Sequence, residues 1–402
     1  MTSVVHDFTA RARTERSWWA AAILLVLAVV YPLVVEPLQD LPLIGDFLPG
    51  TRSMVAMLVV TMMALGLNVV VGYAGLLDLG YVAFYAAGAY MAGWFASLQF
   101  DQVTFHLWST VSNDAPGIHL SMWLVLVMAG VFTTIVGILI GLPTLRLRGD
   151  YLAIVTLGFG EIIPQFVRNA DEEGLGFDLT NGTFGIAPID SFGLGFGDFV
   201  YRDQSNAADL YYWTAILLLL FTVFCCIRLR DSRLGRAWIA IREDETAAAA
   251  MGVPLMRTKT WSYAIGAFFG GIAGAFYASF NAGAFPSQFF FNFSIFILCM
   301  VILGGIGSIW GVLAGGMILG YLNYEGLSTI GSKVQDAGLD FDPTKYQFGI
   351  YGFIIVAVML FRPTGLIPER RHKIELEEGV HDTPFYDVQH EGTLTDRSQS
   401  DD

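Results

Sequence analysis

Long uncharged apolar runs recur along almost the whole sequence. A helix that crosses a membrane needs about 20 consecutive, mainly apolar residues, and these runs have that length. The pattern therefore predicts an all-α polytopic membrane protein. The predicted spans are residues 18–35, 52–71, 73–98, 122–142, 151–168, 212–228, 260–280, 292–322 and 347–361.

Two of these runs depart from a simple helix. Residues 292–322 are too long for one span and contain Gly304-Gly305-Ile306-Gly307-Ser308, so they form either two short helices or one long broken helix. Residues 73–98 form either a complete span or a re-entrant segment. We therefore expect about nine or ten transmembrane helices, some of them broken.

The first run could also be read as a cleaved signal peptide, because three arginines precede it. Its length exceeds that of a typical signal-peptide core, and Glu36-Pro37-Leu38-Gln39 offers no small-x-small cleavage site. We interpret residues 18–35 as a retained helix.

Ten spans place both termini on the same side of the membrane, and the basic residues identify that side. The N-terminus, residues 143–150, residues 228–259 and the C-terminal tail hold seventeen of the Lys and Arg residues, against five in the opposite loops. Positively charged loops stay in the cytoplasm. We therefore expect a plasma-membrane protein with both termini cytoplasmic.

This topology gives a domain plan. Residues 1–17 form a cytoplasmic N-terminus, and residues 18–365 form the membrane domain. Within it, residues 228–259 are a cytoplasmic loop and residues 169–211 an extracytoplasmic loop. Residues 366–402 are acidic, carry few apolar side chains, and are predicted to be a disordered cytoplasmic tail.

The composition excludes several classes of protein. Only 14% of residues are charged, whereas an ordinary soluble domain has about 25%. Asp and Glu number 36 against 22 Lys and Arg, and a net charge of -14 argues against a nucleic-acid partner. Such an acidic chain is typical of a salt-adapted protein, which suggests a halophile as its source. Cys225, Cys226 and Cys299 lie inside apolar runs and are expected to be buried, inert thiols.

Residues that support catalysis or cofactor binding are missing from the predicted spans. All six histidines fall in predicted loops or termini, which leaves no haem ligand, metal site or buried histidine base between the helices. No Gly-Lys dipeptide occurs, so the chain has no phosphate-binding P-loop. We expect neither an enzyme nor a cofactor. Uphill transport would take its energy from a partner protein or from an ion gradient.

One candidate site is a predicted break in a span, where three glycines and a carboxylate occur close together. Asn68, Gly72, Gly75, Asp78 and Gly80 belong to this stretch. A carboxylate at membrane depth is costly, and irregular backbone is tolerated there only inside protein or beside a cavity. The stretch is either part of a transport pathway or a tight turn in which Asp78 caps the following helix.

Two further polar residues lie in the span that follows the basic loop at 146–150. Glu161 is about ten residues, or roughly 15 Å, into that helix, and Thr156 lies between. They are candidates for the same pathway, or for hydrogen bonds between helices.

The cytoplasmic loop contains a predicted short helix over residues 243–252. Acidic residues open it, alanines follow, Gly252 ends it and Pro254 comes next. Such a polar, alanine-rich helix suits a groove on another protein. The alternative is a surface helix that packs on the membrane bundle.

The extracytoplasmic loop is long and acidic, and it contains the glycosylation sequence Asn181-Gly182-Thr183. It is either a solvated connector or a docking rim for an extracytoplasmic partner. Elsewhere, Gly266, Gly270 and Gly274 repeat every fourth residue, which favours close helix packing, within the chain or between subunits.

Several long motifs together resemble one known family. Five segments are similar, in order and spacing, to the second permease subunit of branched-chain amino acid ABC importers. They are residues 67–90, 147–161, 235–252, 264–278 and 301–311. The resemblance covers roughly residues 52–365. It implies a non-catalytic permease that works with a homologous permease, two cytoplasmic ATP-binding subunits and an extracytoplasmic solute-binding protein.

The resemblance also assigns the 243–252 helix as the segment that docks into the ATPase. Its residues are Arg242, Glu243, Asp244, Glu245, Ala248 and Gly252. The acidic residues are shifted relative to the wider importer pattern, so the pattern does not identify which acidic residue contacts the ATPase.

Two alternatives remain at this level. Urea and short-chain amide importers use related permeases, and nothing in the sequence identifies the solute. A standalone secondary transporter would couple to protons through Asp78 or Glu161.

Overall fold

The computed structural model describes residues 27–35, 37–39, 45–109, 111, 115–147, 149–171, 174, 176–193, 200–204, 206–336, 338 and 342–367. The predicted N-terminal segment 1–17, the start of the first span and nearly all of the acidic tail lie outside these residues. Residues 27–35 of the first predicted span are helical.

The described chain is mainly helical, with one small sheet. The α-helices are α2 (Thr51–Asn68), α3 (Val82–Phe95), α4 (Met122–Thr144), α5 (Asp150–Arg168), α7 (Ala207–Arg230), α8 (Arg233–Glu243), α9 (Glu245–Ala250), α10 (Leu255–Phe280), α11 (Phe291–Gly304), α12 (Ile309–Tyr321), α13 (Leu327–Asp336) and α14 (Gln347–Phe361). Two π-helices, η2 (Val69–Tyr73) and η6 (Leu322–Gly326), follow α2 and α12 directly. Short 3-10 turns are η1 (Gly45–Phe47), η3 (Gly182–Phe184), η4 (Tyr201–Asp203), η5 (Pro286–Gln288) and η7 (Pro343–Tyr346).

Seven helical segments in the described part of the chain are long and apolar enough to cross a membrane. This confirms the all-α polytopic class. The run 292–322 forms two helices, α11 and α12, because Gly305 and Gly307 adopt positive φ values of 117° and 89° between them. The run 73–98 contains one α-helix, α3, which has 14 residues and starts at Val82, and its last residues include a short strand.

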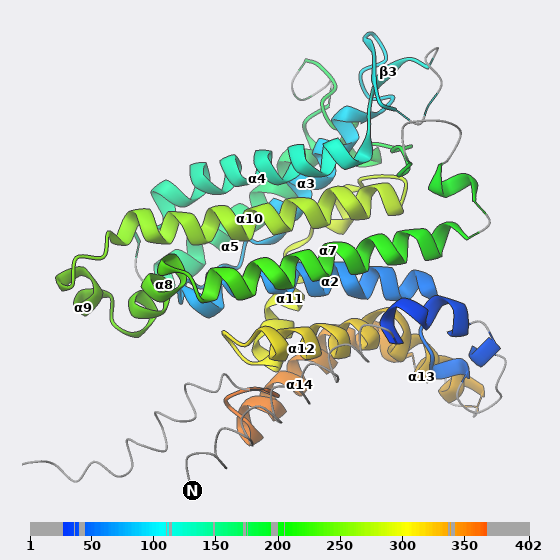
Figure 1. Cartoon of the computed structure of the whole chain (residues 1–402). Coiled ribbons are helices and arrows are strands. Elements are labelled where there is room, and N and C mark those ends of the chain that lie inside the picture. Colours follow the sequence, from blue (N-terminus) through cyan, green and yellow to red (C-terminus); the bar gives the residue numbers. More distant parts are fainter. Residues whose placement is uncertain are drawn as a thin grey trace, which may run out of the picture.

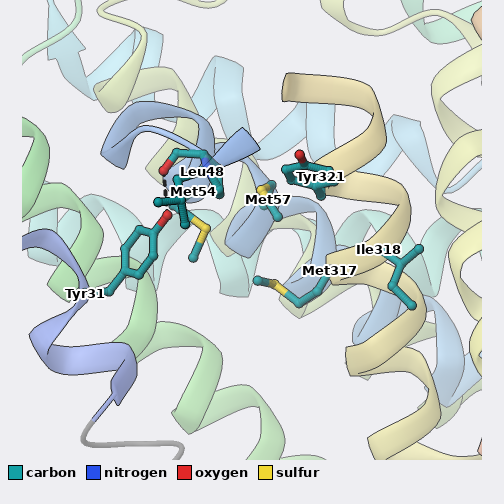
Figure 2. A pocket seen from close by; sticks show the side chains of 8 residues that line it. Tyr31, Leu48, Met54, Met57, Met317, Ile318 and Tyr321 are labelled. Carbon is teal, nitrogen blue, oxygen red and sulfur yellow. Dashed lines mark hydrogen bonds between the residues drawn. The ribbon is translucent and has the colours of Figure 1, made fainter. Parts of the chain in front are cut away.

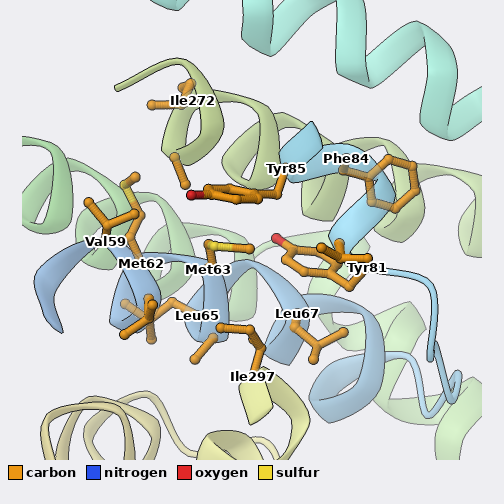
Figure 3. Packing of buried hydrophobic residues seen from close by; sticks show 14 of the residues in the cluster. Val59, Met62, Met63, Leu65, Leu67, Tyr81, Phe84, Tyr85, Ile272 and Ile297 are labelled. Atoms are coloured by element: carbon orange, nitrogen blue, oxygen red, sulfur yellow. The ribbon is translucent and has the colours of Figure 1, made fainter. Parts of the chain in front are cut away.

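The long helices α2, α4, α7 and α10 lie side by side (Figure 1). The segment formed by α2 and η2 is almost wholly buried in the bundle, whereas α14 is almost wholly exposed. The exposed apolar residues of α14 are therefore available to contact lipid or another subunit. Figure 3 shows the core beside α2, where Tyr81 and Tyr85 pack over Met63 and Leu67.

Close backbone contacts hold α10 against its neighbours. A Cβ on Gly88 would overlap the carbonyl of Gly271, and a Cβ on Gly274 would overlap the carbonyl of Tyr85. Helix pairs in lipid associate through such small residues. Gly266, Gly270 and Gly274 all contact other parts of the same chain, which supports the internal-packing interpretation of this stripe.

The end of the bundle opposite α8 and α9 carries a three-stranded sheet (Figure 1). Its strands are β1 (Ala96–Ser97), β2 (Thr104–Leu107) and β3 (Gly117–Leu120), in the order β1-β3-β2. Strand β3 pairs antiparallel with β1 and parallel with β2. The helical periodicity of the flanking runs gave no indication of these short strands.

The sheet overturns the expectation that all histidines lie in loops or termini. His106 and His119 lie on β2 and β3, their rings stack with centroids 5.1 Å apart, and His119 is only 2% exposed. The Nδ1 atom of His119 lies 2.7 Å from Oδ2 of Asp190. Burial raises the pKa of the Asp190 carboxyl, and His119 and Arg202 offset part of this effect.

Cys226 and Cys299 are buried, as expected, and Cys225 is partly buried.

Candidate functional site

The glycine-rich stretch after α2 breaks the helix as predicted. Helix α2 passes into the π-helix η2, which ends at Tyr73, and α3 begins only at Val82. Gly75 has a φ of 69°, in the left-handed region that favours glycine, and Leu76 N–H donates to the carbonyl of Val70 over 3.1 Å. Such π-helical turns inside membrane helices frequently mark functional positions.

Asp78 lies inside this break and is 2% exposed. Its Oδ1 accepts a hydrogen bond from Gly80 N–H over 2.9 Å, so it closes a turn. The alternative in which Asp78 caps the next helix is wrong in its detail, since the N-cap of α3 is Tyr81. Oδ2 of Asp78 has no hydrogen-bond partner among the described residues, and a buried carboxylate oxygen left in this way is costly.

Asn68 and Gly72 join the break to the turn between α11 and α12. Oδ1 of Asn68 accepts a hydrogen bond from Gly307 N–H over 2.9 Å. A Cβ on Gly72 would overlap Oδ1 of Asn68 and would lie 2.7 Å from Gly307 N, so only glycine fits. The two predicted residues therefore act as one packing unit.

Thr156 and Gly80 join the break to α5. Oγ1 of Thr156 accepts a hydrogen bond from Leu79 N–H over 3.1 Å, and a Cβ on Gly80 would overlap the carbonyl of Thr156. Glu161, by contrast, is exposed on α5, and no hydrogen bond or ion pair joins it to the break among the described residues. The structure brings together six of the seven predicted pathway residues and leaves Glu161 apart.

Two residues at the break were missed from the sequence. Ser294 of α11 accepts a hydrogen bond from Val82 N–H over 2.9 Å through its Oγ. A Cβ on Gly160 of α5 would lie 3.2 Å from the Cα of Gly80. A lone serine at a helix start carries no distinctive pattern, whereas the Gly158-Phe159-Gly160 pair of small residues was a usable signal.

The loop 228–259 forms two helices: the short helix predicted over 243–252 is present as α9, two residues shorter at each end, and α8 precedes it. Helix α8 ends at Glu243, Asp244 is extended, and α9 covers Glu245–Ala250. Oδ1 of Asp244 accepts hydrogen bonds from Thr246 N–H and Ala247 N–H over 2.8 and 3.0 Å. An aspartate that caps a helix in this way ends one helix and starts another, because its own backbone is not helical. We call α8, α9 and the turn between them the coupling corner.

The coupling corner is fixed to the start of α10. Lys259 Nζ lies 2.9 Å from Oε1 of Glu245, and Trp238 Nε1 donates to the carbonyl of Thr258 over 2.7 Å. Trp238, Lys259 and Ala248 are buried. The inner face of α9 thus packs on the bundle, as expected if this segment is a surface helix of the membrane domain.

The outer face of the coupling corner is exposed in the part of the chain that the structure describes. Glu243, Asp244 and Gly252 are exposed, and Met251 is 86% exposed. Hydrogen bonds from the Thr246 hydroxyl and from the Ala247 and Thr246 amides hold the pKa of Asp244 below its ordinary value. A negative and apolar surface of this kind remains available to a partner.

Arg242 connects the coupling corner to the helix break. Its Nη1 donates a hydrogen bond to the carbonyl of Gly72. A Cβ on Gly75 would lie 2.6 Å from Cγ of Arg242, so the arginine stem lies directly on the Gly75 backbone. The two sets of residues predicted separately from the sequence meet at this side chain.

A separate apolar pocket of about 370 Å³ lies near the start of α2, at the other end of that helix from the break. Met54, Met57 and Met317 line it together with Tyr31 and Tyr321 (Figure 2). Tyr31 donates to the carbonyl of Pro49 over 2.6 Å, so little polar surface remains for a ligand. Among the described residues, no group of three or more His, Cys, Asp or Glu side chains could hold a metal ion.

Comparison with known proteins places the chain beside a group of transporters. The family described as branched-chain amino acid transport system / permease component matches residues 51–359. The high-affinity branched-chain amino acid transport system permease protein LivM of Salmonella typhimurium is 36% identical over 375 residues, covering 89% of this chain and 76% of the relative. LivM of Escherichia coli is 36% identical over 374 residues, with the same coverage.

A more distant relative and a second kind of permease also match. The probable branched-chain amino acid transport permease protein LivM of Methanocaldococcus jannaschii is 26% identical over 325 residues, which cover 76% of this chain and 90% of the relative. The permease protein LivH of Escherichia coli is 30% identical over 160 residues, or 40% of this chain and 46% of the relative. No solved structure matches the chain significantly.

Proposed function

Because this chain belongs to the family of permease components of branched-chain amino acid transport systems, we propose that it is one permease subunit of an ATP-driven importer for branched-chain or related amino acids. Members of this family are transport permeases rather than enzymes, in agreement with the chemistry missing from the sequence.

The observation that carries the proposal is the contact between the coupling corner and the helix break. A cytoplasmic ATPase that binds the exposed face of α9 would act on Glu243, Asp244 and Met251. Helix α8 carries Arg242 from that surface to the carbonyl of Gly72. The site for the partner and the broken helix are therefore one mechanical unit.

The proposed importer also requires partner subunits other than the ATPase. The similarity to LivH supports a homologous second permease, and the family resemblance supports two ATP-binding subunits and an extracytoplasmic solute-binding protein. We place both termini and residues 228–259 in the cytoplasm of the cell, and residues 169–211 outside the plasma membrane. The sheet end of the bundle would then face the solute-binding protein.

The first experiment tests for the partners. The tagged full chain is expressed in its host and purified in mild detergent. We expect wild type to recover a second permease and an ATPase, and Glu243→Lys with Met251→Glu to lose the ATPase. Asp101→Lys, an exposed change at the sheet end, is the matched control and keeps it.

Reconstitution then tests transport. In liposomes with its partners, the complex should take up leucine only when ATP and the solute-binding protein are present. Uptake of urea or short-chain amides in place of leucine would move the proposal to that related class of importer.

The unpartnered Oδ2 of Asp78 favours one second candidate, a proton-coupled carrier. Such a carrier would purify alone and transport without ATP, and Asp78→Asn would remove the pH dependence of uptake. ATP-independent transport of this kind would overturn the importer proposal.

A further inference from the structure

Arg242 occupies an unusual position for a cation in a membrane protein. It lies in the last turn of α8 and is half-buried, and among the described residues no carboxylate lies within ion-pair distance of it. Its Nη1 instead donates to a backbone carbonyl, that of Gly72, on a segment 170 residues earlier in the chain. The guanidinium therefore joins two segments of the chain, and no ion pair with a described carboxylate competes with this contact.

The carbonyl that it contacts is one that the helix itself leaves free. The π-helix η2 ends at Tyr73, and the last carbonyls of a helix have no donor within that helix. The guanidinium thus supplies a donor that the break needs. The stem packs on Gly75, whose left-handed φ of 69° leaves the backbone bare at the point of contact.

The other end of the contact is firmly held. Trp238 on α8 is fully buried and bonds to the carbonyl of Thr258, and Glu245 on α9 pairs with Lys259. A displacement of the coupling corner therefore moves α8 as a body, with Arg242 at its end. Two hydrogen bonds join the region of the break to other helices: Asn68, just before it, accepts from the α11–α12 turn, and Leu79 donates to Thr156 of α5. A displacement of the break would therefore act on both.

We propose that Arg242 is the positioning residue that transmits movement of the coupling corner to the broken helix at Gly72–Gly80. The inference rests on the proposed function, because it requires an ATPase on the outer face of α9. It assigns one side chain to the step between ATP-driven movement and the opening of the pathway, a step that the family membership leaves without a residue.

The test separates binding, hydrolysis and transport in the complete reconstituted complex. Arg242→Gln keeps most of the apolar stem and a donor group but loses the charge and the reach of the guanidinium. We expect the ATPase to stay bound and to hydrolyse ATP, while amino acid uptake per ATP falls by about tenfold or more. Arg52→Gln is the matched control, since Arg52 is exposed at the start of α2, at the other end of that helix from the break, and its coupling should equal that of wild type.

A second measurement keeps the proposal testable if the glutamine variant fails to assemble. In wild type, ATP binding should change amide hydrogen exchange both in residues 231–259 and in residues 69–81. In Arg242→Lys, which lacks the fork of donors, the change should weaken in 69–81 and persist in 231–259. Equal changes in both segments in the variant, or no change at 69–81 in wild type, would overturn the proposal.

The two levels of failure give different results. A wild-type complex without ATP-driven uptake would contradict the proposed function itself. A wild-type complex that couples normally, with Arg242→Gln coupling equally well, would contradict only the role of Arg242.

Discussion

Nδ1 of His119 lies 2.7 Å from Oδ2 of Asp190, and Nε2 of the same ring lies 3.2 Å from the carbonyl of Pro116. The pair joins strand β3 to the loop that reaches the end of α10, where the Asp190 carbonyl accepts a hydrogen bond from Ser279 over 2.7 Å. This loop and the sheet therefore form one structure at the end of the bundle opposite α8 and α9.

Removal of one member of this pair should loosen that end of the protein. Since a buried polar group that loses its hydrogen-bond partner costs about 1–3 kcal/mol, His119→Ala should lower the melting temperature clearly, whereas exposed Asp101→Ala should not. Burial raises the pKa of Asp190, so the folded state disfavours its ionised form, and stability falls as the pH rises from about 3.8 through the raised pKa. The difference between wild type and His119→Ala should widen over that window.

Thermal unfolding in detergent at several pH values measures this effect. The double variant His119→Ala/Asp190→Asn removes the buried charge and should flatten the pH dependence. A constant difference between wild type and His119→Ala across the window would show that the pair does not act through the charge of Asp190.

The contact between α3 and α10 depends on glycine. Gly88→Ala would bring its methyl group against the backbone carbonyl of Gly271, which cannot rotate away as a side chain can. Overpacking costs about 1–3 kcal/mol or more, so we expect a marked loss of folded protein in size-exclusion profiles. Gly158→Ala on α5 is the control, since nothing lies within 4 Å of its Cβ position. Equal yields for both variants would contradict the close approach.

The cap of α9 should depend on Asp244. The pKa of its carboxyl is lowered, first by the Thr246 hydroxyl and then by the Ala247 and Thr246 amides, so the folded state favours the ionised form. The stability that it contributes is therefore complete above about pH 3.8 and is lost as the pH falls through the lower folded value. Asp244→Ala should increase amide exchange in residues 245–250 at neutral pH. Asp244→Asn keeps a capping oxygen and should remain protected without the pH dependence.

The pair between Glu245 and Lys259 should show an asymmetry. Lys259 has a side chain only 5% exposed, so Glu245→Gln leaves a buried ammonium without its partner. We expect Glu245→Gln to lower the melting temperature more than the double variant Glu245→Gln/Lys259→Met, in which the charge is also removed. A double variant that is less stable than the single one would contradict this expectation. Glu243→Gln, an exposed change two residues earlier, serves as the control.

Much of the fold could be predicted because single helices in a membrane satisfy their own backbone hydrogen bonds. The runs 122–142, 151–168, 212–228, 260–280 and 347–361 all form helices close to their predicted bounds. The break after α2 was predicted from its glycines. The small sheet was not, since β2 and β3 have four residues each and pair across a loop, which local patterns do not reveal.

The residues of the candidate site could also be predicted only in part. The sequence indicated Asn68, Gly72, Asp78 and Thr156 because polar residues and glycines are rare in apolar runs. It also indicated Glu161, which lies exposed on another face of α5, since the rotation of a helix about its axis is set by its neighbours. The use of Asp78 in a turn, and of Asp244 as a cap between two helices, depends on backbone geometry that spacing does not determine.

The sequence by itself determined that this chain is a helical membrane protein, where its helices break and to which transporter family it belongs. These properties are local or are carried by long contiguous motifs. Only the tertiary structure decided that Arg242 meets Gly72 and that His119 meets Asp190, because each pair is far apart in the chain. Contacts of that kind follow from how helices pack side by side, and packing depends on the shapes of all the neighbours together.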